Sequence, residues 1–296
     1  MSESSLLNQL LNDLRSDDKQ RQRRALNRLA RLLNTLHGDD QQPHVSDPQA
    51  LLREPAILPL LIEILHNRDR EIRVSAAHAL GLLGESSAIP ALLDSLLDRS
   101  KDVRRAAAKA LGALGETEAV PGLVGALLAD ENSYVRWEAA KALHTLEASA
   151  ALPELLEALA ADDNSYVRYA AAEALGAIGE RAALDGLEAA LLDDRNDYVR
   201  FAAARALGQI ADPTSVPVLL QALNSDNTHI WHAAAEALWM MDEAAMPYVF
   251  EGLLDEAPHI RRATLKAILW LSAEFDDEEV ADNRDSDWIG LWGWWN

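Results

Sequence analysis

The chain has 296 residues and a formal net charge of −21, from 27 lysines and arginines against 48 aspartates and glutamates. A surface of this sign repels phosphate backbones, so we expect no nucleic-acid partner. The sequence has no cysteine, which excludes disulfides and thiolate chemistry. No apolar run approaches the ~18 residues of a membrane span, and the first residues do not resemble a signal peptide. We therefore expect a cytoplasmic protein without a membrane span.

Residues 1–37 predict a pair of helices that caps one end of the molecule. Leucines at helical spacing mark two apolar faces, and Ser16-Asp17-Asp18 supplies an N-cap between them. The second helix is basic, with Arg21, Arg23, Arg24, Arg28 and Arg31. We interpret this as the charged outer face of a terminal repeat, and the alternative is a docking surface for an acidic partner. Residues 38–56 predict a polar loop with one short helix around 48–53.

Residues 57–272 predict seven repeats of about 32 residues, each a pair of helices. One pattern recurs almost unchanged as Asn132-Ser-Tyr-Val-Arg136, Asn164-Ser-Tyr-Val-Arg168 and Asn196-Asp-Tyr-Val-Arg200, each followed by alanines and a leucine. A proline stands near the start of each first helix except the fifth, which has Asp185. Self-similarity at this period predicts an all-α fold, a right-handed α-solenoid of about eight helical-hairpin repeats.

Two further patterns support this register. An aspartate precedes the arginine by six residues in most repeats, as at Asp98, Asp130, Asp162, Asp194 and Asp255. The sixth repeat has Ser225 and Trp231 instead, so we interpret the aspartate and the arginine as a structural pair that forms charge-assisted bonds within and between layers. Gly84, Gly115 and Gly179 follow second helices, where a left-handed C-cap is expected. The Gly112…Gly115 pattern is accordingly interpreted as capping rather than as a phosphate-binding loop.

The pattern Asp-x5-Arg, with Val-Arg-x-x-Ala-Ala-x-Ala-Leu-Gly, resembles HEAT repeats, and in particular the short subclass named after phycobilisome bilin lyases. The resemblance covers residues 57–272. It implies the solenoid fold, whereas members of the subclass include chromophore lyase subunits, a hydroxylase, scaffold proteins and engineered binders. In the hydroxylase, His-Glu dipeptides hold the metal, and this sequence has none.

Second helices of such a solenoid are expected to line its concave groove. Positions two before, one after and five after the arginine share a helix face, and in three successive repeats they carry aromatic residues. The candidate partner-binding residues are Tyr134, Trp137, Lys141, Tyr166, Tyr169, Tyr198, Phe201, Arg205, His229, His232 and Trp239. A contiguous exposed aromatic patch is typical of a binding site. The alternative is that the aromatic rings pack on one another and stiffen the ridge.

Catalytic and metal sites are not predicted. No nucleophile motif or Walker loop occurs. His229, His232, Glu236 and His259 have the ligand chemistry of a Zn or Fe site, but we interpret them as polar groups that contact a partner.

The last 24 residues, 273–296, depart from the repeat. Residues 273–287 carry eight acidic residues and one arginine, which predicts a solvated linker. The tail motif that follows contains Trp288, Trp292, Trp294 and Trp295. Three alternatives stay open for this motif. It caps the last repeat, inserts into the aromatic groove as a lid, or is captured by a partner.

Two functions of different class follow. The first is a non-enzymatic scaffold or assembly factor that binds a protein or peptide in the groove without a cofactor. The second, implied by the resemblance, is a subunit of a phycobilin lyase or chromophore chaperone that acts in a hetero-oligomer. In that case the aromatic residues would stack a bilin, with Lys141 and Arg205 on its propionates. We expect the first function, and therefore no enzymatic activity.

Overall fold

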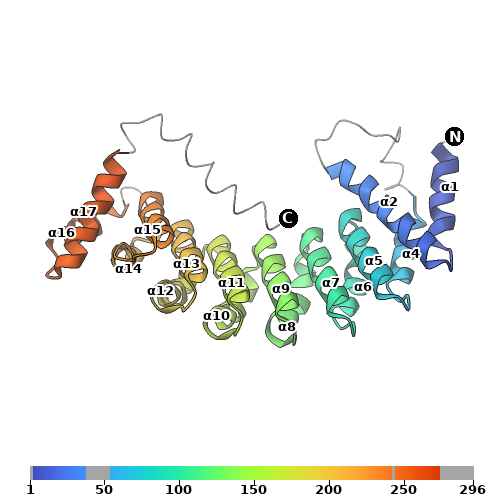
Figure 1. Cartoon of the computed structure of the whole chain (residues 1–296), viewed down its shortest axis with the longest axis horizontal. Helices are drawn as coiled ribbons and strands as arrows, with labels where there is room; N and C mark the ends of the chain where they lie inside the picture. Colours follow the sequence, from blue (N-terminus) through green and yellow to red (C-terminus); the bar gives the residue numbers. More distant parts are fainter. Residues whose placement is uncertain (1–2, 38–53, 242–243, 274–296) are drawn as a thin grey trace. The chain divides into compact units, whose positions relative to one another are not determined.

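The computed structural model describes residues 3–37, 54–241 and 244–273, and all regular structure in these ranges is helical (Figure 1). The chain divides into two compact units, residues 1–178 and 179–296. The described residues form eight helical hairpins, five in the first unit and three in the second, which confirms the predicted all-α repeat fold. The short helix predicted around residues 48–53 lies outside the described ranges.

Each hairpin contributes a first and a second helix. In unit 1 the first helices are α1 (Glu3–Leu14), α4 (Ile57–Ile64), α6 (Ile89–Ser95), α8 (Val120–Ala129) and α10 (Leu152–Ala161). The second helices are α2 (Lys19–His37), α5 (Arg70–Leu83), α7 (Lys101–Leu114), α9 (Ser133–Thr145) and α11 (Ser165–Ile178). In unit 2 the first helices are α12 (Leu184–Asp193), α14 (Val216–Ala222) and α16 (Met246–Leu254), and the second are α13 (Asp197–Ile210), α15 (Thr228–Met240) and α17 (Pro258–Ala273).

The helix ends follow from local chemistry. Proline occupies the first turn of α6, α8, α10, α14 and α16, where a backbone N–H is not needed. At the start of α9, Asn132 accepts a 3.1 Å hydrogen bond from the backbone N–H of Tyr134. Gly84, Gly115 and Gly179 have φ of +75°, +75° and +72°, which confirms the left-handed conformation predicted for them.

Gly112 has a different role from the one expected, because it lies inside α7 rather than at its cap. A Cβ at this position would stand 2.8 Å from the Cβ of Ala142 on α9. Gly81 on α5 would meet Ala110 on α7 in the same way. The absence of a side chain at these positions therefore lets neighbouring second helices approach closely.

This close approach sets the layering of unit 1. The second helices α2, α5, α7, α9 and α11 pack against one another in succession along one layer, whereas the first helices of neighbouring hairpins contact each other much less (Figure 1). Because the more closely spaced layer lies on the inside of a curved stack, the second helices form the inner layer of unit 1.

A ladder of arginine–aspartate bonds joins the hairpins. Arg136 on α9 donates two hydrogen bonds, of 2.7 and 2.9 Å, to Asp162 before α11, and a third of 3.0 Å to the backbone carbonyl of Asp130 before its own helix. Arg104 binds Asp130 in the same way, at 2.6 and 2.9 Å. Each arginine thus donates hydrogen bonds both to the turn before its own helix and to the carboxylate of the following repeat.

This geometry corrects the pairing expected within the sixth repeat. The carboxylate that an arginine clamps belongs to the next repeat, so Ser225 and Trp231 interrupt two different steps of the ladder. Ser225 occupies the position of the aspartate that Arg200 would bind. Arg200 instead donates a 3.0 Å hydrogen bond to the backbone carbonyl of Leu191 and forms an ion pair with Asp197 at 3.5 Å. The joint loss of the two residues was therefore not evidence that they bind each other.

Candidate partner-binding face

The predicted aromatic residues of unit 1 lie on two adjacent helices of the inner layer. Tyr134, Trp137 and Lys141 are on α9, and Tyr166 and Tyr169 are on α11, and these two helices pack directly against each other. Their positions fall within about 60° of one another around each helix. We call these five residues the aromatic face.

Exposure distinguishes these side chains from the core. Tyr134 is 55% exposed and Tyr166 is 49% exposed, whereas Val135 and Val167 beside them are fully buried. Small side chains already fill the space between the helices, since Ala139 and Ala171 are also fully buried. The two tyrosines are therefore not needed to fill the core, and their rings are presented to solvent.

Polar contacts hold the other rings in place. The Lys141 ammonium lies 4.5 Å from the centre of the Trp137 ring, a cation–π arrangement. The Tyr169 hydroxyl donates a 2.9 Å hydrogen bond to the Glu173 carboxylate one turn further along α11. These contacts reduce the number of conformations that the side chains of the face adopt. Binding of a partner would therefore lose less conformational entropy.

Two cations that we did not single out as site residues border this face. Arg105 and Lys109 on α7 occupy the positions equivalent to Trp137 and Lys141, and both are exposed. Within the described ranges neither has a carboxylate at ion-pair distance. Their signal was already in the sequence, since they share the helix-face spacing of the aromatic residues.

Two exposed acidic residues, in the turns before α9 and α11, contact arginines of the ladder. Glu131 contacts Arg104 at 3.4 Å, and Asp163 contacts Arg136 at 2.6 Å. Both carboxylates are about 87% exposed and belong to the ladder turns. The side of the aromatic face that borders α7 thus presents the cations Arg105 and Lys109, whereas Asp102 on the same face of α7 is paired with Arg70 at 2.9 Å.

Unit 2 carries the remaining predicted residues. On α13, Tyr198 is 68% exposed and the Arg205 guanidinium lies 5.8 Å from the centre of the Phe201 ring. On α15, His229, His232 and Trp239 are exposed, and the His232 ring makes an edge contact with Trp231. The described part of the chain, which contains His229, His232, Glu236 and His259, brings no three histidine, aspartate or glutamate side chains together as a metal site would require.

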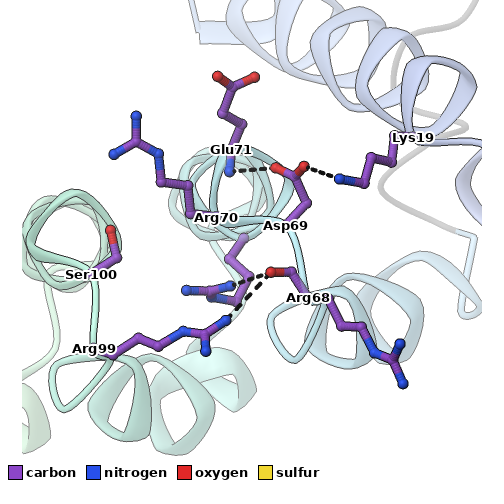
Figure 2. Close-up of a pocket in the computed structure, with 8 residues that line it drawn as sticks. Lys19, Arg68, Asp69, Arg70, Glu71, Arg99 and Ser100 are labelled. Atoms are coloured by element: carbon purple, nitrogen blue, oxygen red, sulfur yellow. Dashed lines mark hydrogen bonds and ion pairs between the residues drawn. The ribbon is translucent and has the colours of Figure 1, made fainter.

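A cavity of about 470 Å³ lies at the N-terminal end of α5, and Figure 2 shows residues that line it. It is lined by Lys19, Arg68, Asp69, Arg70, Glu71, Arg73, Arg99 and Ser100. The bonds from the Lys19 ammonium, at 2.7 Å, and from the backbone N–H of Glu71, at 2.9 Å, hold the pKa of Asp69 below its usual value.

Four of the five cations that line this cavity, Lys19, Arg70, Arg73 and Arg99, already have acceptors. Arg70 contacts Asp102 at 2.9 Å, Arg73 contacts Asp98 at 2.8 Å, and Arg99 donates to the Arg68 carbonyl. The same contacts join α2, α5 and α7, so we interpret the cavity as part of the packing between repeats rather than as a ligand site.

The tail motif, Trp288, Trp292, Trp294 and Trp295, lies outside the described residues. At the other end of the chain, the arginines of α2 are exposed, which agrees both with a terminal cap and with the alternative, a docking surface for an acidic partner. Among the described helices, none is both long and apolar enough to cross a membrane.

Several solved structures align with most of this chain. An engineered protein aligns over 90% of this chain and 78% of its own, with 22% identity and a TM-score of 0.53, and this likeness concerns the fold alone. The complex of CpcE and CpcF of phycocyanin lyase from Nostoc sp. aligns over 82% of this chain and 96% of its own, with 27% identity and a TM-score of 0.48. Human deoxyhypusine hydroxylase aligns over 90% and 96%, with 22% identity and a TM-score of 0.38.

Comparison with curated proteins gave no significant match. The model of the family described as HEAT repeats matches residues 6–101, 58–144, 120–208 and 184–269, which together span nearly the whole helical region. The chain is therefore a member of the HEAT-repeat family.

Proposed function

We propose that this protein is a binding scaffold that holds a segment of a partner protein against the aromatic face of unit 1. The observation that carries this proposal is the exposure of Tyr134 and Tyr166, about half of each side chain, on two helices that pack directly together. Tyrosine and tryptophan contribute strongly to binding when they are buried by a partner. Ordered rings beside a basic border offer both apolar contact and charge recognition.

The chemistry of the face indicates the class of segment it would bind. Arg105 and Lys109 have no ion-pair partner among the described residues, and Lys141 is held over Trp137. A segment with carboxylates near an aromatic or large apolar side chain would satisfy both parts of the face. We therefore expect an acidic peptide segment with an aromatic anchor, in an extended or helical conformation.

Affinity capture with three full-length proteins tests this proposal. The first is the unmodified chain, and the second is Tyr134→Ala with Tyr166→Ala. The third is a matched control, Leu97→Ala with Leu128→Ala, which removes two exposed apolar side chains away from the aromatic face. Partners held through the face are retained by the first and third proteins and lost by the second. Partners retained equally by all three would contradict the proposal.

An absorption spectrum of the same eluates tests the alternative. Support for a tetrapyrrole ligand comes from stackable rings, Tyr134, Tyr166 and Trp137, beside the Lys141 cation, which suits a propionate. A visible pigment band that disappears in the tyrosine variant, without a stoichiometric protein partner, would replace the scaffold by a bilin-binding function.

A further inference from the structure

The last hairpin of unit 2 exposes three large apolar side chains, two of them at positions that are buried in the hairpin before it. Phe250 on α16 is 56% exposed, and Leu265 and Leu269 on α17 are 51% and 60% exposed. We call these three residues the end face. Exposed apolar groups on three positions of one hairpin are unusual for the end of a solenoid, which normally carries polar residues.

Comparison with the preceding hairpins shows what these positions contact. Leu220 on α14 is the equivalent of Phe250, and it packs against Gly252 of the following hairpin. The equivalent of Leu265 on α15 is Ala235, which is fully buried, whereas the equivalent of Leu269 on that helix, Trp239, is 54% exposed. The end face therefore points to where a further layer would lie.

The hydrogen bonds of Arg261 on α17 also indicate that a further layer would lie against the last hairpin. Its Nη1 donates to the backbone carbonyls of Asp255 and Glu256, at 2.6 and 2.8 Å, as the ladder arginines do within their own hairpins. In Arg104 and Arg136 the other edge of the guanidinium, Nε and Nη2, binds the aspartate of the next repeat. Within the described ranges, that edge of Arg261 has no carboxylate.

The chain that directly follows α17 has the composition that both features require. Residues 274–287 include eight acidic residues, and residues 288–295 include four tryptophans. Fully extended, 14 residues span at most about 50 Å, which is several times the 8–10 Å between packed helices. The acidic stretch is thus long enough to bring the tryptophans onto the hairpin that precedes it.

We propose that residues 274–296 close the solenoid by binding the end face of their own chain. A carboxylate of residues 274–287 binds the open edge of Arg261, which completes the ladder. The tryptophan side chains cover Phe250, Leu265 and Leu269. This inference does not depend on the aromatic face of unit 1.

Cysteine modification tests the proposal, because the chain has no native cysteine. Leu265→Cys places a single thiol on the end face of the full-length chain. Its rate of modification is compared with that of the same variant carrying Trp288→Ala, Trp292→Ala, Trp294→Ala and Trp295→Ala. If the tail covers the face nine-tenths of the time, the four substitutions raise the rate about tenfold. Equal rates in the two backgrounds would overturn the proposal.

Three controls make the result specific. Leu97→Cys, an exposed site in unit 1, reacts at the same rate with and without the tryptophans. Arg261→Gln speeds modification at the end face, whereas Arg262→Gln, the neighbouring exposed arginine, does not. Protection that persists on dilution assigns the tail to the same chain. Protection that disappears on dilution would instead mean that the segment of a second copy covers the face, and would overturn closure within one chain.

Discussion

Arg136 and Asp162, which lie in successive repeats, form a buried bidentate pair with side-chain exposures of only 13% and 7%. Arg136 also contacts Asp163, whose side chain is 87% exposed. One guanidinium thus binds two neighbouring carboxylates, one buried and one exposed. Substituting each carboxylate in turn therefore measures how much burial adds to the stability that an ion pair contributes.

We predict that Asp162→Asn destabilises unit 1 by about 3 kcal/mol, because it removes the buried counter-charge of the Arg136 guanidinium and leaves only the exposed carboxylate of Asp163. Asp163→Asn changes an exposed contact and should cost about 0.5 kcal/mol or less. Denaturant unfolding of both variants, followed by circular dichroism, gives the comparison. Equal costs for the two substitutions would show that burial does not strengthen the pair.

The ladder also predicts how stability depends on pH. Burial alone would raise the pKa of Asp162, but hydrogen bonds from Arg136 and from the backbone N–H of Asn164 outweigh it and lower the pKa below 3.8. The pKa of Asp98 is lowered in the same way, by Arg73 and the N–H of Ser100 against the effect of burial. Because the folded pKa values are depressed, the stabilisation is complete above the usual aspartate pKa and is lost as the pH falls through the lowered values.

Acid titration of unfolding free energy checks this sign. Stability should be level near neutrality and decline below about pH 4, the usual aspartate pKa. Asp162→Asn should reduce the slope of that decline, since it removes one of the titrating groups. A variant with an unchanged slope would exclude Asp162 as a contributor.

The interrupted step of the ladder can be repaired. Ser225→Asp should place a carboxylate opposite Arg200 and stabilise unit 2 by about 1 kcal/mol. The new aspartate also keeps the existing cap, in which the Ser225 hydroxyl accepts a 3.2 Å bond from the backbone N–H of Asn227. Ser225→Asn is the matched control, because it retains a capping oxygen without the charge. A gain shared by both variants would assign the effect to capping instead.

Three glycines of unit 1 should respond differently to alanine. Gly112→Ala brings a Cβ to 2.8 Å from Ala142 and should cost about 1–3 kcal/mol through overpacking. Gly115→Ala forces a side chain into φ +75° and should cost about 1 kcal/mol. Gly125→Ala, inside α8 with open space around it, should stabilise the helix by about 0.8 kcal/mol. Thermal unfolding ranks the three, and destabilisation at Gly125 would contradict this assignment.

Much of the fold could be predicted from sequence because each hairpin repeats the same local signals. The prolines, the Asn caps and the glycines at Gly84 and Gly115 act within a few residues of their own helix, so their effect can be deduced without tertiary contacts. The aromatic positions followed from helical periodicity alone, and the structure places Tyr134 and Tyr166 on adjacent packed helices with their side chains exposed.

Contacts between repeats were harder to deduce. The partner of Arg136 lies 26 residues further along the chain, whereas Asp130 lies only six residues before it. The repeated spacing therefore did not distinguish bonds within a hairpin from bonds between hairpins. Gly112 was assigned to capping because Ala142, which excludes a side chain there, is in the next repeat. The end face escaped notice because Leu265 and Leu269 match a normal helical core pattern until the packing shows what they face.

The central claim, that the aromatic face recognises a partner, is tested most directly by calorimetric titration of a captured partner into three full-length proteins. These are the unmodified chain, Tyr134→Ala with Tyr166→Ala, and Leu97→Ala with Leu128→Ala. We predict that the tyrosine variant binds with affinity reduced about 30-fold or more, as for loss of hot-spot residues worth about 2 kcal/mol. The leucine control should bind like the unmodified chain. Equal affinity in all three, with unchanged circular dichroism, would contradict the claim and place recognition elsewhere on the molecule.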